Sequence, residues 1–287
     1  MASALKIGLF GVHRGAQAEP VALSRRARLA EQAGFESIWV GDHVSLPMGS
    51  QAVAAYPPEQ HRLEAIGTLC YLAAVTTRVR LGVGVIVVPQ RQPLLLAKQL
   101  TTVDVLSKGR LIFGIGVGYV ESELRALGVS MSERALRTDE YLAAIRAAWD
   151  ESAPDFSGRF VEWSELMQRP LPVQKPHPPV VVGGSSAAAY RRALRSANGF
   201  FGHNWTLEET RRNLAEIREL ALMVERPKAL GELELTITPR EPLDLDIARR
   251  YAELGVHRLA ILPRDLDSPT ATEELIQQVG ETVIGRL

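Results

Sequence analysis

Residues 80–118 read RLGVGVIVVPQRQPLLLAKQLTTVDVLSKGRLIFGIGVG, and in this stretch two glycine-bearing apolar runs flank one amphipathic segment. The runs Arg80 to Val88 and Arg110 to Val117 are typical of strands that are buried on both faces. Between them, Gln92 to Leu106 carries apolar residues at helical spacing. The stretch therefore predicts a βαβ unit, in which a helix joins two parallel strands.

The glycines at the ends of these two strands have two explanations. A glycine in a strand often marks a place where another group approaches the backbone closely. It also relieves crowding inside a barrel, where a side chain would not fit. The sequence leaves both explanations open.

The whole chain repeats the strand and helix alternation eight times, and only the segment from Asp155 to Pro179, rich in proline and tryptophan, departs from it. We expect this segment to form a short hairpin beside the sheet. Eight units in sequence predict an α/β protein with a single (β/α)8 TIM barrel, one domain over residues 1–287, and a small excursion between strands four and five. An open doubly wound sheet is the alternative. The predicted strands are Lys6–Gly11, Ser37–Asp42, Arg80–Val88, Arg110–Val117, Pro179–Gly183, Gly199–His203, Glu234–Thr238 and Arg258–Leu262. The predicted helices are Pro20–Ala33, Arg62–Thr76, Gln92–Leu106, Ser132–Asp150, Thr206–Val224 and three that begin at Ser185, Asp244 and Thr270.

Composition limits the classes of partner. The chain has 287 residues, 33 basic and 33 acidic, and it shows no basic stripe, so we expect no nucleic-acid partner. Its first residues, MASALKIGLFG, are too short and too strand-like for a signal peptide, and no apolar run approaches the roughly 20 residues of a membrane span. We therefore expect a cytoplasmic protein. Cys70 is the single cysteine, and no spacing of Asp, Glu and His resembles a metal cage, so we expect neither a disulfide nor a metal site.

In such a barrel, chemistry is found at the carboxyl ends of the strands. Strand two ends at Asp42 and His43, whose side chains point to opposite faces of the strand. A histidine at the rim serves as an acid or base near neutral pH, or it caps the next loop. Strand five ends at Gly183, Gly184 and Ser185, which form either an anion site at a helix start or an ordinary start of a helix.

Five segments together resemble the luciferase-like monooxygenase superfamily, and more narrowly its branch of F420-dependent oxidoreductases. They are ESIWVGDHV (36–44), the stretch from Thr76 to Arg110, LIFGIGVGYVESELRALG (111–128), RPLPVQKPHPPVVVGGSS (169–186) and NGFFGHN (198–204). The resemblance covers most of Lys6 to Glu225 and is weaker beyond. It implies a TIM barrel that binds a flavin or deazaflavin at the strand ends, commonly in a homodimer.

The resemblance also implies roles for particular residues. His43 matches the family's acid or base near the reactive ring, with Asp42 beside it. Gly84 and Val85 match a bulge in strand three that often contains a non-proline cis peptide and supports the ring from behind. The backbone that lies along the cofactor matches Gly116, Val117 and Gly118, and the region that receives the cofactor phosphate matches Gly183, Gly184 and Ser185.

The sequence departs from the sugar-phosphate dehydrogenases of this branch at two positions. They carry a glutamate where this chain has Tyr119, and a tryptophan where it has Val44, so glucose 6-phosphate is a poor substrate prediction. The segment from Leu46 to His61 is expected to cover the substrate. Arg91, with Lys98 behind it, is a candidate partner for the acidic tail of F420.

From these features we expect an oxidoreductase that transfers a hydride between coenzyme F420 and a small organic substrate, with His43 as proton donor or acceptor. An FMN-dependent two-component monooxygenase is one alternative. A barrel that binds flavin without turnover is the other. Barrel aldolases and isomerases rank last, because the strand ends carry no lysine or carboxylate pair of the kind they need.

Overall fold

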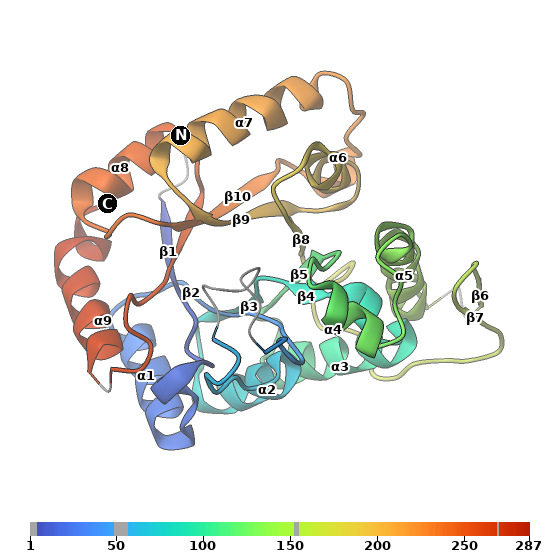
Figure 1. The fold of residues 1–287 in the computed structure, drawn as a ribbon, viewed down its shortest axis with the longest axis horizontal. Coiled ribbons are helices and arrows are strands. Elements are labelled where there is room, and N and C mark those ends of the chain that lie inside the picture. The colour runs from blue at the N-terminus through green and yellow to red at the C-terminus, as the bar shows by residue number, and fades with distance from the viewer. Residues whose placement is uncertain (1–4, 49–56, 152–154, 269) are drawn as a thin grey trace.

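The main sheet of the protein closes into a barrel. The computed structural model describes residues 5–48, 57–151, 155–268 and 270–287. All strands of this sheet pair in parallel, and β3 contacts both β2 and β5, so the sheet has no open edge between them (Figure 1). The closure excludes an open doubly wound sheet and confirms the predicted TIM barrel. The barrel strands are β1 (Lys6–Phe10), β2 (Ser37–Val40), β3 (Arg80–Val83) with β4 (Ile86–Val87), β5 (Leu111–Gly116), β8 (Val180–Gly183), β9 (Gly199–Trp205), β10 (Glu234–Pro239) and β11 (Arg258–Ile261).

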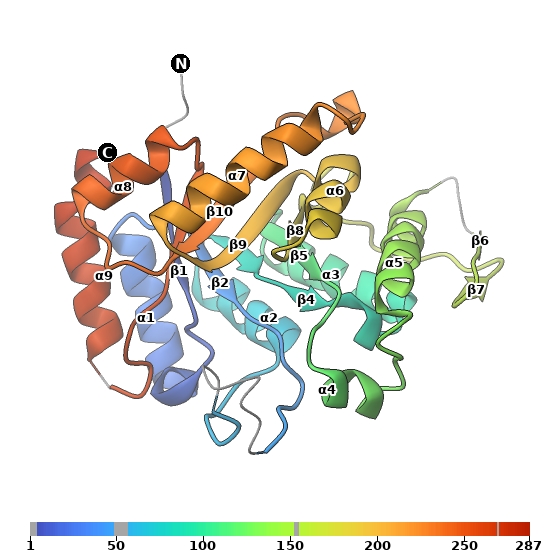
Figure 2. The same ribbon diagram turned by 45° about the horizontal axis from the view of Figure 1, so that its top comes forward.

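Helices surround the barrel on the outside, as Figures 1 and 2 show from two directions. Their starts follow local sequence: α7 begins with a capping box in which Thr206 and Glu209 bond each other's backbone, and α1 and α3 begin at prolines. The helices are α1 (Pro20–Gln32), α2 (Ala65–Val75), α3 (Pro93–Leu106), α4 (Glu121–Ala126), α5 (Arg134–Trp149), α6 (Ala187–Ser196), α7 (Leu207–Ala221), α8 (Leu245–Glu253) and α9 (Ala271–Thr282). Short 3₁₀ turns are η1 (Gly15–Ala18), η3 (Val88–Gln90), η4 (Lys228–Leu230) and η5 (Ile284–Arg286).

Several predicted elements differ in their bounds from those observed; the helix predicted at Arg62–Thr76, for example, is observed at Ala65–Val75. The third strand is broken between Val83 and Ile86, and Val88 belongs to a 3₁₀ turn. The segment after Gly118, in which no helix was predicted before Ser132, contains α4. The helix predicted from Ser185 begins at Ala187, because Ser186 caps it with its hydroxyl. The predicted hairpin is confirmed as the antiparallel pair β6 (Phe156–Ser157) and β7 (Glu162–Trp163).

The apolar core has two main parts. The larger one fills the space between the barrel strands and the helices. The smaller one lies within the barrel and includes Phe10, Trp39 and Phe201. Below Trp39, the fully buried guanidinium of Arg258 pairs with Glu36 and Glu234, at 2.8 Å between Nε and the Glu36 Oε2 atom. This ion pair satisfies a buried charge at the amino-terminal end of the barrel.

No helix in the described part of the chain is both long enough and apolar enough to span a membrane.

Candidate active site

The carboxyl ends of the strands surround a cavity of about 610 Å³. It brings together all of the residues predicted for the site, and their roles stay predictions: Asp42, His43, Gly84, Val85, Gly116, Val117, Gly118, Gly183, Gly184 and Ser185. Half of the loop predicted to cover the substrate, residues 49–56 of 46–61, lies outside the described residues.

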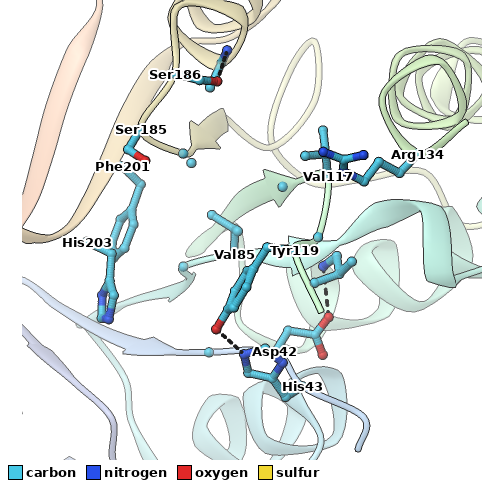
Figure 3. A pocket seen from close by; sticks show the side chains of 18 of the residues that line it. Asp42, His43, Val85, Val117, Tyr119, Arg134, Ser185, Ser186, Phe201 and His203 are labelled. Atoms are coloured by element: carbon cyan, nitrogen blue, oxygen red, sulfur yellow. Dashed lines mark hydrogen bonds between the residues drawn. The ribbon is translucent and has the colours of Figure 1, made fainter. Parts of the chain in front are cut away.

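The wall of the cavity carries a bulge between β3 and β4. The predicted cis peptide between Gly84 and Val85 is confirmed, and Val85 lines the cavity (Figure 3). A Cβ on Gly116 would lie 2.6 Å from a methyl group of Val85, and one on Gly183 would lie 2.8 Å from the other. Of the two explanations for the strand-end glycines, crowding therefore accounts for these two positions, because the neighbouring strands make room for Val85.

Asp42 supports the bulge through a buried ion pair. Its carboxylate accepts hydrogen bonds from the Val87 amide at 3.0 Å and from two nitrogens of Arg91 at 2.6 and 2.8 Å. The second Arg91 nitrogen also contacts Glu64 at 2.9 Å. Burial alone would lower the pKa of Arg91, but the Asp42 carboxylate raises it. This geometry assigns Asp42 a positioning role.

These contacts also correct the prediction for the cofactor tail. Arg91 is held between Asp42 and Glu64, and the Lys98 ammonium donates to the carbonyl of Arg169. Both side chains thus have protein partners, which counts against their predicted role at the cofactor tail.

His43 is held by a glutamate that the sequence analysis did not identify. The Nδ1 atom of His43 lies 3.1 Å from the Oε2 atom of Glu123, which comes from α4 and is 2% exposed. The other carboxylate oxygen accepts from the amides of Val44 at 2.6 Å and Ser45 at 3.1 Å. Burial would raise the pKa of Glu123, but the bonds from His43 and Ser45 outweigh it and lower the pKa. The ionised carboxylate therefore accepts the Nδ1 proton of His43.

This pairing determines what His43 presents to the cavity. With the proton on Nδ1, the Nε2 atom of a neutral His43 is an acceptor. Nε2 lies 3.4 Å from the hydroxyl of Tyr119, and the two rings pack edge to face at 5.7 Å (Figure 3). His43 can thus receive a proton from a bound molecule or return one to it.

The start of α6, where the sequence predicts either an anion site or an ordinary helix start, lies at one end of the cavity. Ser185 and Ser186 line it, and the first amide groups of a helix have no partner within the helix. Arg134, from α5, lines the same cavity, and its buried Nε atom has no hydrogen-bond partner among the described residues. Arg192 also lines it but is paired with Asp139 at 2.5 and 3.0 Å.

Glu123 was missed because VESELRALG after strand four reads as a polar loop. The available signal was the pair of acidic residues Glu121 and Glu123 directly ahead of the apolar Leu124. Acidic residues are enriched in the first turn of a helix. Arg134 was missed because a single arginine near a helix start is ordinary on a surface.

A closed parallel barrel with a cavity at the carboxyl ends of its strands and a histidine–carboxylate pair at its rim is an arrangement typical of TIM-barrel enzymes. The family model for the luciferase-like monooxygenases matches residues 6–242. The chain therefore belongs to the luciferase-like monooxygenase family.

Two proteins related in sequence and one solved structure are similar to the chain. An uncharacterized protein of Mycobacterium tuberculosis is 33% identical over 241 residues, which cover 80% of this chain and 83% of the relative. An FMNH(2)-dependent dimethylsulfone monooxygenase of Pseudomonas putida is 29% identical over 198 residues, or 68% of this chain and 52% of that protein. The structure of an F420-dependent secondary alcohol dehydrogenase with an F420-acetone adduct superposes with a TM-score of 0.77 over 99% of this chain and 98% of that one, at 15% identity, which shows a shared fold. Family membership makes the chain a flavin- or F420-dependent type of oxidoreductase, and these two relatives differ in cofactor.

Proposed function

We propose that the protein is an F420-dependent oxidoreductase that transfers a hydride to or from an organic substrate whose reacting carbon bears an oxygen. The observation that carries the proposal is the His43–Glu123 pair, because hydride transfer at such a carbon requires a proton to leave or join the oxygen. Glu123 keeps the accepting Nε2 atom of His43 available, and Tyr119 is close enough to share its proton.

The residues around the cavity fit a tricyclic cofactor with a phosphate. Val85 and Phe201 offer an apolar wall, and the first amides of α6 with Ser185 offer donors to an anion. Arg134 would add a cation there, and its buried Nε atom lacks a protein partner among the described residues. When bound, F420 supplies or accepts the hydride. The protein would orient the substrate and hold the proton at His43.

A second candidate is an FMN-dependent monooxygenase, and the similarity to the dimethylsulfone monooxygenase favours it. A barrel that binds flavin without turnover is the third candidate. F420 and FMN share a ring system and a phosphate, so the apolar wall of Val85 and Phe201 and the start of α6 would serve either cofactor. We further propose a homodimer, which the mass in solution tests.

Parallel fluorescence titrations of the purified protein with F420 and with FMN test the assignment. We expect F420 to bind at least tenfold more tightly, which corresponds to about 1.4 kcal/mol. Tighter binding of FMN would move the assignment to the monooxygenases. Binding of neither would remove the oxidoreductase proposal.

A further inference from the structure

One side of the cavity carries a set of basic side chains that neither the bulge nor the start of α6 uses. We call it the cationic wall, and its members are His13, Arg14, Arg62 and His203, which all line the cavity. Figure 3 shows His203 on one side of Val85 and Arg134 on the other. Ser185 and Ser186, at the end where we place the cofactor phosphate, lie in the same view (Figure 3) beyond Phe201 from His203, so Phe201 stands between that end and the cationic wall.

The wall is built around the ring of Phe10. The guanidinium carbon of Arg14 lies 5.7 Å from the centre of this ring, and the rings of His13 and His203 lie 6.4 and 5.5 Å from it. Arg14 is 4% exposed, and its backbone forms a bridge with that of Arg62. Packing thus brings Arg14 and the two histidines to one apolar platform, with Arg62 beside Arg14.

His13 offers a hydrogen-bond donor to the cavity. Its ring is 2% exposed, and its Nε2 atom accepts from the amide of Gly41 at 3.1 Å. An amide can only donate, so the neutral ring carries its proton on Nδ1. That Nδ1 atom is buried and has no hydrogen-bond partner among the described residues. Buried donors are normally paired, so an unpaired one in the lining of a cavity marks a candidate position for an acceptor group.

The charges on this side are positive. Burial and the charges of Arg14 and Arg62 hold the pKa of His13 well below its ordinary value, and burial and Arg14 lower the pKa of His203 to about 4. Both histidines are therefore neutral donors beside two cations at neutral pH. Among the described residues that line the cavity, Asp42 is the only acidic one, and it is paired with Arg91.

We propose that the cationic wall binds a carboxylate of the substrate, so that the substrates of this protein are small organic acids. The inference rests on the proposed function, since it assigns the cofactor to the α6 end and leaves the cationic wall to the substrate. The Arg14 guanidinium and the neutral imidazole of His13 match a carboxylate in charge and in hydrogen bonding. Arg62, whose guanidinium donates to the Pro57 carbonyl and to Gln60, adds a second positive charge beside them. Phe10 and Phe201 would contact the apolar part of the substrate.

The experiment compares phenylacetate with phenylacetamide, which have similar shape but differ in charge. Each compound is titrated calorimetrically into the protein alone and into the protein saturated with F420 or FMN, whichever of the two the protein binds more tightly. We expect phenylacetate to bind at least tenfold more tightly than the amide. In Arg14→Gln the preference should fall below threefold, and Arg14→Lys should keep most of it. Arg211→Gln, on the exposed face of α7, is the matched control and should keep it fully.

Each other result overturns the inference. Equal binding of the two probes, no binding of phenylacetate, or an unchanged preference in Arg14→Gln would show that the wall does not select a carboxylate. A loss of F420 affinity in Arg14→Gln with an unchanged probe preference would assign the wall to the cofactor tail. If Arg14→Gln does not fold, Arg62→Gln carries the same comparison, because Arg62 is less buried. The titration with protein alone separates this result from failure of the proposed function, which the cofactor titrations decide.

Discussion

Replacing Glu123 with glutamine should reverse the proton position on His43. The Oε1 atom of Glu123 accepts from the amides of Val44 and Ser45, while Oε2 faces Nδ1 of His43. A glutamine would keep its oxygen on the two amides, because turning its NH₂ group toward them would leave two donors unsatisfied at about 1–3 kcal/mol each. The NH₂ group must then donate to Nδ1. The neutral ring would carry its proton on Nε2 and present a donor to the cavity.

The cost to turnover follows from this reversal. If His43 is the base, the variant loses the acceptor that takes the substrate proton, and the rate of substrate oxidation should fall about 10²- to 10⁴-fold, or about 2.7–5.5 kcal/mol. An asparagine in place of the aspartate of a serine-protease triad has an effect of this kind through the wrong tautomer. Cofactor affinity should stay within about threefold.

Two assays check the prediction. Nitrogen-15 NMR of the histidine rings reports the tautomer without a known substrate, and steady-state kinetics report turnover once one is found. Glu121→Gln is the matched control, since Glu121 is exposed on the same helix. An Nδ1-protonated His43 in Glu123→Gln, or full turnover, would refute the reasoning.

Two further changes test the surroundings of the cavity. Because the folded protein lowers the pKa of His203 from 6.5 to about 4, the unfolded chain binds a proton first as pH falls through this window, and stability should drop by about 2–3 kcal/mol. His203→Gln should flatten this slope in urea unfolding, and an unchanged slope would contradict the assignment. Gly183→Ala should destabilise the protein by about 1–3 kcal/mol, because its Cβ would lie 2.8 Å from Val85. In calorimetric melting, Gly183→Ala should cost less stability when it is combined with Val85→Ala. The control Gly67→Ala should cost little stability, because the atom nearest to its new Cβ is 3.6 Å away. Equal losses of stability with and without Val85→Ala would count against the packing argument.

The sequence predicted the barrel well because buried parallel strands produce a strong signal. The apolar run from Arg110 to Val117 appears as β5, ending one residue earlier, and the run from Glu234 to Thr238 appears as β10, ending one residue later. Both strands are bounded by turns or polar residues, and both are nearly fully buried on their central positions. Local pattern is enough for such elements.

Partners of charged side chains were harder to predict because they are distant in sequence. Arg91 was predicted as a candidate partner for the acidic tail of F420, yet it meets Asp42, 49 residues earlier, inside the protein. Glu123 meets His43, 80 residues earlier. Only the closed barrel brings such pairs together, and a single sequence carries no signal of which carboxylate faces which cation. The positions at the strand ends could be predicted, but their partners could not.

The two adjacent residues at the end of β2 explain how one strand serves two purposes. Asp42 and His43 follow β2, which ends at Val40, and their side chains meet different elements: Asp42 accepts from the Val87 amide of β4, while His43 pairs with Glu123 of α4. The first pair fixes the wall that carries Val85, and the second fixes the proton on His43. A change to Asp42 should therefore disturb cofactor binding through the bulge, whereas a change to Glu123 should disturb proton transfer with the wall intact. Comparing Asp42→Asn with Glu123→Gln by cofactor titration separates the two roles, and equal losses of affinity in both variants would show that the pairs act as one unit.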